Sequence, residues 1–116
     1  MYSFIVNPNA SGGRGERIWR RLEKQLKHLG VPYEAFVTEK TGDARRLACD
    51  LTEHQREPRI LIAVGGDGTV SEVLDGISFC GPVTLGYIPT GSGNDLARSL
   101  RLPKSPSRCL KKILNP

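Results

Sequence analysis

The sequence has no long hydrophobic run, few cysteines and few aromatic residues. No apolar stretch approaches the roughly 20 residues of a transmembrane helix, and the N-terminus lacks the basic start and long apolar core of a signal peptide. Cys49, Cys80 and Cys109 are odd in number and form no C-x-x-C pair, which argues against a disulfide framework or a thiolate metal site. We therefore expect reduced thiols and a cytoplasmic location, either free or peripheral at the inner face of the membrane.

Two familiar phosphate-binding signatures are also missing. No G-x-x-x-x-G-K-[ST] occurs, which excludes a P-loop. Gly91-Ser92-Gly93 is followed by Asn94-Asp95-Leu96, so the third glycine of the dinucleotide-binding fingerprint is absent. The aromatic residues make up 6% of the chain and are scattered, which offers no stacking platform, and nucleic acid is not an expected partner.

The remaining pattern alternates strands with helices over one domain-sized chain of 116 residues. Apolar runs predict strands at residues 2–6, 33–37, 59–64 and 83–88. Amphipathic spacing predicts helices over residues 16–29 and from about residues 43, 69 and 106. Gly30 is expected to end the first helix, Thr41 to cap the second, and Ser105 with Pro106 to open the last. This order predicts an α/β fold: a layered, open, mainly parallel sheet flanked by helices, Rossmann-like.

The most informative segment is the β-branched run 59–64, which leads directly into Gly65-Gly66-Asp67-Gly68-Thr69. A strand, a glycine turn and a helix N-terminus together form an anion site, because free N–H groups and the helix dipole point at one place. We expect Gly66 and Gly68 to adopt positive φ so that the turn can expose its N–H groups. Asp67 would repel a bare phosphate, so it suggests a Mg²⁺ bridge or a proton acceptor.

Two further glycine-rich loops follow predicted strands, at residues 7–15 and 89–93. The carboxyl ends of parallel strands share one edge of the sheet, where ligands bind. Three such loops can therefore converge on one polyphosphate. The alternative is that each loop is a tight strand-to-helix connection without a ligand.

Three blocks of this sequence resemble the catalytic domain of diacylglycerol kinases and related lipid kinases, a group that includes sphingosine and ceramide kinases. The blocks are Asn7-Pro8 with the following Ser-Gly-Gly, the Gly65–Thr69 block with Glu72, and the run 89–98, Pro-Thr-Gly-Ser-Gly-Asn-Asp-Leu-Ala-Arg. The stretch 38–44 also resembles the family. Ser92 stands where the family usually has threonine, and both are small hydroxyl residues.

This resemblance implies transfer of the γ-phosphate of ATP to a lipid hydroxyl, with diacylglycerol converted to phosphatidic acid. It implies catalytic roles for Asp67 and Asp95. The implied nucleotide-binding residues are Asn7, Ser11, Thr38, Gly65, Gly66, Asp67, Gly68, Thr69, Glu72 and Thr90.

Several of these residues have competing structural roles. Asp95 can instead pair with a helix dipole. Glu72 can form a capping box with Thr69. Lys40 and Arg98 can bind phosphate or can be surface and ion-pair residues.

The resemblance also implies a second, mainly β domain that this chain does not contain. That domain would supply a further catalytic acid, metal-linked residues and much of the lipid surface. We expect residues 1–116 to be a single nucleotide-binding domain, truncated from a longer two-domain lipid kinase; an unusual short member is the alternative. No metal-ligand set is assigned within the chain, and Mg²⁺ is expected to be bound indirectly near Asp67 and by the second domain.

The net charge of +5 favours anionic partners. Much of this charge lies on or just before the first helix, at Arg14, Arg17, Arg20, Arg21, Lys24 and Lys27. These side chains form either a solvated helix face or a patch that contacts an anionic membrane. A homodimer is left open. Two other functions also stay open: an NAD kinase-like enzyme, which shares the G-G-D-G turn, and a regulatory nucleotide-binding module without catalysis.

Overall fold

Four parallel strands in the order β2-β1-β3-β4 form the sheet of the computed structural model, which describes residues 2–53, 57–77, 83–91 and 98–115. The elements in chain order are β1 (Tyr2–Val6), α1 (Arg14–Leu29), β2 (Tyr33–Val37), α2 (Asp43–Thr52), β3 (Arg59–Gly65), α3 (Asp67–Gly76), β4 (Val83–Pro89) and α5 (Pro106–Leu114). The predicted α/β fold and its parallel sheet are confirmed, and each predicted strand lies where its apolar run indicated.

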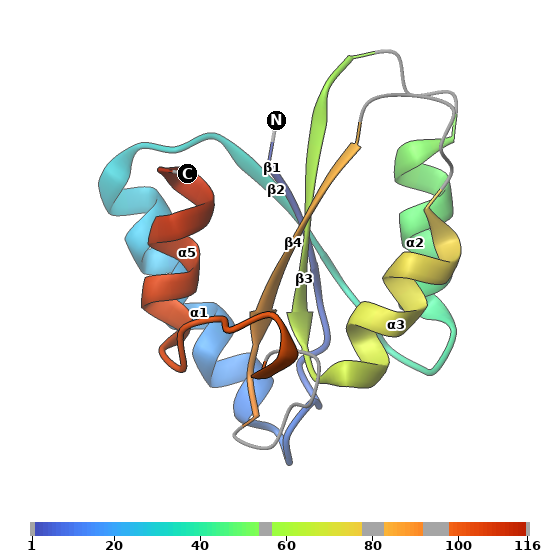
Figure 1. Ribbon diagram of the computed structural model, residues 1–116, viewed down its shortest axis with the longest axis horizontal. Helices are drawn as coiled ribbons and strands as arrows, with labels where there is room; N and C mark the ends of the chain where they lie inside the picture. The colour runs from blue at the N-terminus through green and yellow to red at the C-terminus, as the bar shows by residue number, and fades with distance from the viewer. Residues whose placement is uncertain (1, 54–56, 78–82, 92–97, 116) are drawn as a thin grey trace.

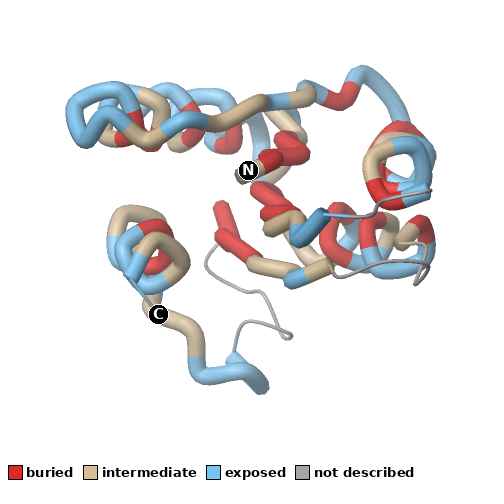
Figure 2. The backbone as a smooth tube through the Cα atoms, turned by 90° about the horizontal axis from the view of Figure 1, so that it is seen from above, coloured by how far each residue is buried: buried red, intermediate tan, exposed pale blue. Residues whose placement is uncertain are grey.

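The helices cover both faces of the sheet. Helices α1 and α5 lie on one face, and α2 and α3 lie on the other (Figure 1). The central strands β1 and β3 are therefore buried from both sides, as Figure 2 shows by the concentration of buried residues between the helical layers. This double burial explains why residues 60–64 are continuously apolar rather than alternating.

Two of the three helix ends predicted from the sequence are confirmed, and one is wrong. Gly30 ends α1 in the left-handed conformation, with its N–H donating to the carbonyls of Leu26 and Lys27. The Ser105 side chain accepts the N–H of Arg108 at the start of α5. The expectation for Thr41 is wrong: Gly42, at φ 95°, occupies the cap position of α2 and no side chain caps it. Within the described residues no helix is both long and apolar enough to cross a membrane.

The glycines whose geometry excludes a larger side chain differ from those expected, Gly66 and Gly68. Gly66 is extended at φ −93°, and Gly68 lies inside α3 with open space where a Cβ would stand. The expected positive φ at these two residues is therefore wrong, because the turn enters α3 through ordinary extended backbone. Backbone atoms instead lie close to Gly15 and Gly76: an added Cβ would lie 2.4 Å from the Asn7 carbonyl oxygen and 2.1 Å from that of Arg45, respectively.

Candidate functional site

The strand order creates a switch point between β1 and β3. The chain leaves β1 for α1 on one face of the sheet and leaves β3 for α3 on the other face. Loops that diverge in this way open a crevice at the carboxyl ends of the strands. The three glycine-rich loops of the sequence follow β1, β3 and β4, so they share this edge.

The backbone ladder continues one residue past three strands. The N–H of Asn7 donates to the Val64 carbonyl at 3.0 Å, that of Thr38 to Val6 at 2.8 Å, and that of Thr90 to Gly65 at 3.0 Å. These bonds fix the first residue of each loop relative to the end of a neighbouring strand. The positions of their side chains therefore depend on the rigid core and not on flexible loops.

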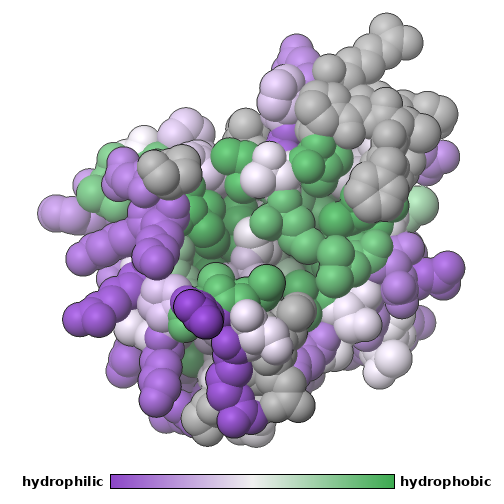
Figure 3. All heavy atoms as spheres, viewed as in Figure 1, coloured by the Kyte–Doolittle hydropathy of each residue, from purple (hydrophilic) through white to green (hydrophobic). Residues whose placement is uncertain are grey.

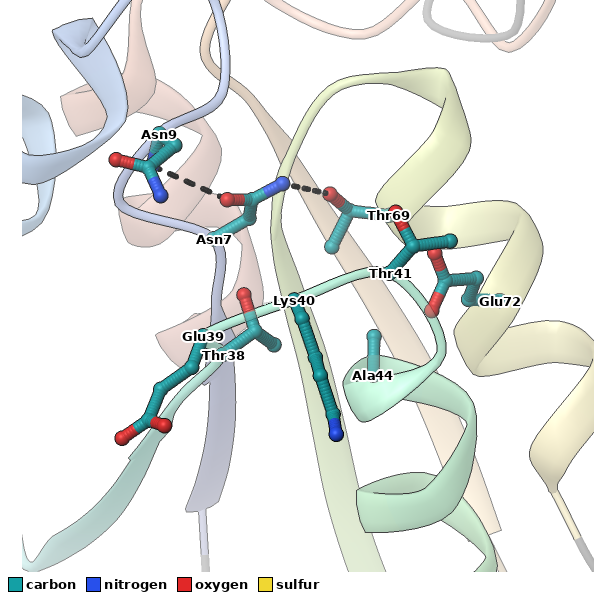
Figure 4. Close-up of a pocket in the computed structure, with 9 residues that line it drawn as sticks. All are labelled: Asn7, Asn9, Thr38, Glu39, Lys40, Thr41, Ala44, Thr69 and Glu72. Carbon is teal, nitrogen blue, oxygen red and sulfur yellow. Dashed lines mark hydrogen bonds between the residues drawn. The ribbon is translucent and has the colours of Figure 1, made fainter.

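A pocket of about 270 Å³ lies at this edge between the loops after β1 and β2 and the first turns of α2 and α3 (Figure 4). Asn7, Asn9, Thr38, Glu39, Lys40, Thr41, Ala44, Thr69 and Glu72 line it. Four of the predicted nucleotide-binding residues therefore meet in one cavity: Asn7, Thr38, Thr69 and Glu72. Small-molecule pockets usually have about 300–1,000 Å³, so this one is small for a whole nucleoside triphosphate.

Asn7 joins the first loop to the start of α3. Its Nδ2 donates to the Thr69 hydroxyl at 3.3 Å, and its Oδ1 accepts the N–H of Asn9 at 3.1 Å. Figure 4 shows these bonds across the top of the pocket, with the Glu39 and Lys40 side chains directed away from them. The N–H of Thr69 is already bonded to the Gly66 carbonyl at 3.1 Å. Thr69 therefore presents mainly its hydroxyl to a ligand.

Two carboxylates occupy the N–H groups around the start of α2. Asp43 accepts hydrogen bonds from the backbone N–H groups of Glu39 at 2.8 Å and Lys40 at 3.0 Å. These bonds lower the pKa of the Asp43 carboxyl, and the bond from Glu39 has the larger effect. Glu72 accepts the N–H of Gly42 at 2.9 Å. The capping-box alternative for Glu72 is wrong, because α3 begins at Asp67 and the side chain reaches across to α2. With these donors satisfied, this side of the pocket suits an uncharged part of a ligand.

Asp67 is the first residue of α3 and is partly buried. It does not line the pocket, but Thr69, two residues along the chain, does. The hydroxyl of Tyr87 donates to its Oδ1 at 3.2 Å. Sequence reasoning missed Tyr87, because a tyrosine within an apolar strand is indistinguishable from an ordinary core residue.

Ser11 and Thr90 lie on the other side of the edge. Their hydroxyls are 3.2 Å apart, and Thr90 is buried. Thr90 lines a separate groove of about 520 Å³ with Arg14, Arg98, Arg101 and Lys104. The structure therefore does not bring Thr90 and Thr38 into one cavity. Asp95 lies outside the described residues.

The described residues do not fit a metal centre held by the protein alone. Across residues 2–53, 57–77, 83–91 and 98–115, no three His, Cys, Asp or Glu side chains gather closely enough to hold a metal ion. Near the pocket, Asp67 and the Thr69 hydroxyl offer at most part of the oxygen shell that Mg²⁺ requires.

Comparison with known proteins decides the family. Residues 1–116 match the model of the diacylglycerol kinase catalytic domain. The chain belongs to the diacylglycerol kinase catalytic domain family. The resemblance stated from the sequence blocks is therefore confirmed.

Individual relatives agree with this assignment. The protein YtlR of Bacillus subtilis, to which its name attributes lipid kinase activity, is 35% identical over 102 residues, covering 87% of this chain and 33% of YtlR. A diacylglycerol kinase of Staphylococcus saprophyticus is 38% identical over 100 residues, covering 85% of this chain and 32% of that protein.

A solved structure shows the same fold. The diacylglycerol kinase of Bacillus anthracis superimposes with a TM-score of 0.76 at 29% identity, over 97% of this chain and 40% of that one. The chain thus spans about a third of the length of the curated bacterial relatives it matches.

Proposed function

We propose that this chain is the ATP-binding part of a lipid kinase that transfers the γ-phosphate of ATP to the hydroxyl of diacylglycerol. The observation that carries the proposal is the convergence of Asn7, Thr38 and Thr69 on one pocket beside Asp67, in a chain of this family. Phosphoryl transfer needs mainly positioning and neutralisation of charge, which polar side chains on rigid strand ends can provide.

The residues have separate roles in this proposal. The nucleoside lies toward Thr38 and Glu72, where the N–H groups are already satisfied. The phosphates lie toward Gly65, Gly66, Gly68 and Thr69 at the start of α3, where the helix dipole favours negative charge. Mg²⁺ would be bound with the nucleotide near Asp67, where it would neutralise phosphate charge. Asp67 orients the attacking hydroxyl and accepts its proton, directly or through a water, as the hydroxyl oxygen bonds to the γ-phosphorus and ADP leaves.

A radiolabelled transfer assay with the full-length protein tests this function. Mg·[γ-³²P]ATP is supplied with phosphatidylglycerol vesicles that contain diacylglycerol, sphingosine or ceramide, and in parallel with NAD. We expect label in phosphatidic acid. Label in NADP alone would establish the NAD kinase-like alternative, and nucleotide binding without any transfer would establish the regulatory module.

We further propose that the face formed by α1 and α5 contacts an anionic membrane. Arg17, Arg20, Arg21, Lys24 and Lys27 are all exposed on α1, and Arg108, Lys111 and Lys112 are exposed on α5. Figure 3 shows hydrophilic side chains gathered on this side of the molecule. Each cation near an anionic surface contributes on the order of 1 kcal/mol.

Vesicle sedimentation distinguishes a membrane patch from a solvated helix face. We expect binding to phosphatidylglycerol vesicles at low salt, loss of binding at high salt, and weaker binding of Lys24→Glu/Lys111→Glu. Equal binding to phosphatidylcholine vesicles, or none to either, would contradict a membrane role for this face.

A further inference from the structure

Tyr87 is a buried tyrosine of β4 whose hydroxyl reaches the carboxylate of Asp67. Its side chain is 6% exposed and belongs to the apolar cluster beneath α2 and α3. The hydroxyl oxygen lies 3.2 Å from Oδ1 of Asp67. A phenylalanine could fill the same apolar space, so the hydroxyl is the part of this side chain that packing does not explain.

The strand register explains why these two residues meet. Tyr87 pairs with Ala63, and Pro89 pairs with Gly65 at the end of both strands. After Gly65, at the end of β3, the chain enters α3 at Asp67, and α3 packs on the face of the sheet on which Tyr87 lies. The contact is therefore set by the sheet and the first turn of α3, both of which are rigid elements.

We propose that Tyr87 is a positioning residue that fixes the orientation of the Asp67 carboxylate for phosphoryl transfer. This inference rests on the role of Asp67 in the proposed function. A carboxylate at the start of a helix can rotate about its side-chain bonds. A hydrogen bond from a buried, immobile donor removes this rotation before the substrate arrives, and small errors of position are costly in catalysis.

The protonation of Tyr87 is consistent with a donor role. Burial, followed by the negative charge of Asp67, raises the pKa of the Tyr87 phenol above its ordinary value of 10.0. The phenol therefore keeps its proton throughout the working range of an enzyme, and it donates while the carboxylate accepts. Such hydrogen bonds to an ionised acceptor are stronger than neutral ones.

A double-mutant cycle in the full-length protein tests the proposal. The values of kcat and KM for Mg·ATP are measured for the wild type, Tyr87→Phe, Asp67→Asn and the double variant, with phosphatidylglycerol vesicles containing diacylglycerol. We expect Tyr87→Phe to lower kcat roughly tenfold, the loss of one hydrogen bond to a charged group, and to leave KM within about twofold. In the Asp67→Asn background, Tyr87→Phe should cause no further loss, because its effect acts through Asp67.

Tyr33→Phe is the matched control. The Tyr33 hydroxyl donates to Glu23 at 2.6 Å, on the opposite face of the sheet from α3 and Asp67. This variant should keep the wild-type kcat. An unchanged kcat in Tyr87→Phe, or a loss that adds in full to that of Asp67→Asn, would overturn the positioning role and leave the proposed function standing. Wild-type kcat in Asp67→Asn would overturn the role of Asp67 itself.

Discussion

The backbone N–H of Gly42 donates to the carboxylate of Glu72 at 2.9 Å, across 30 residues of sequence. Glu72 lies on α3, whose first turn follows the glycine-rich turn, and Gly42 is the cap residue of α2. This bond holds one wall of the pocket against another. The nucleotide contacts that we propose for the loop after β2 and for α3 are therefore coupled through this hydrogen bond.

Replacement of Glu72 should loosen this link. We expect Glu72→Ala to weaken binding of Mg·ATP several-fold and to lower the free energy of unfolding by about 1 kcal/mol, the usual net value of one hydrogen bond. Glu72→Gln keeps an acceptor oxygen and should restore most of both quantities. Titration calorimetry and denaturant unfolding measure them. Asp75→Ala, an exposed carboxylate on the same helix, is the control; an equal effect there would contradict the link.

Two glycines, Gly15 and Gly68, should differ in how far they tolerate alanine. Gly15→Ala places a methyl group 2.4 Å from the Asn7 carbonyl oxygen and should lower the free energy of unfolding by about 1–3 kcal/mol. Gly68→Ala meets open space inside α3 and should leave stability unchanged or raise it by up to about 1 kcal/mol. Thermal melts of both variants decide the point.

The affinity of Gly68→Ala for Mg·ATP tests separately whether this position contacts the nucleotide. Because the substitution causes no strain, weaker binding of Mg·ATP would come from contact between the new methyl group and the nucleotide. If instead Gly68→Ala melts well below the wild type, the open space described for this position is incorrect.

The architecture could be predicted from the sequence, and so could four of the residues that line the candidate pocket, for identifiable physical reasons. Continuous apolar runs such as 60–64 report double burial, and Asn7, Thr38 and Thr69 follow the strand ends that a parallel sheet aligns. The glycine geometry was wrong at Gly66 and Gly68 because composition shows where a chain can turn but not which φ it uses. Contacts between distant segments, such as Glu72 with Gly42 and Tyr87 with Asp67, leave no local signal in the sequence.

A cluster at the opposite end of the sheet should make stability depend on acid pH. Glu34 accepts from the Ser3 hydroxyl at 2.7 Å and from the Arg59 guanidinium at 2.5 Å. These partners, Ser3 first, hold the pKa of the Glu34 carboxyl below its ordinary 4.5. A carboxyl with a lowered pKa stabilises the folded state fully above its ordinary value, and this stability is lost as pH falls through the lower, folded value.

The expected result is a fall in the free energy of unfolding from about pH 4.5 downward that is smaller in Glu34→Gln. Denaturant titrations between about pH 6 and pH 3 measure it. Asp75→Asn serves as the control and should keep the wild-type slope. Identical slopes for the wild type and Glu34→Gln would show that this cluster does not contribute.

Residues 1–116 alone should bind Mg·ATP weakly and should not phosphorylate lipid. The pocket of about 270 Å³ is small for the nucleotide, and the described residues do not complete a metal centre. Calorimetry with Mg·ATP and the radiolabelled transfer assay check both statements. Lipid phosphorylation at the rate of the full-length protein would show that these residues are sufficient.

The proposed role of Asp67 in phosphoryl transfer can be tested by comparing the wild type with a variant that lacks its carboxylate. In the full-length protein, kcat for transfer from Mg·ATP to diacylglycerol and the Kd for Mg·ATP are measured for the wild type and Asp67→Asn. We expect kcat to fall roughly a hundredfold or more, as for loss of a general base, while Kd and melting temperature stay close to wild type. A folded Asp67→Asn protein that retains wild-type kcat would contradict this role.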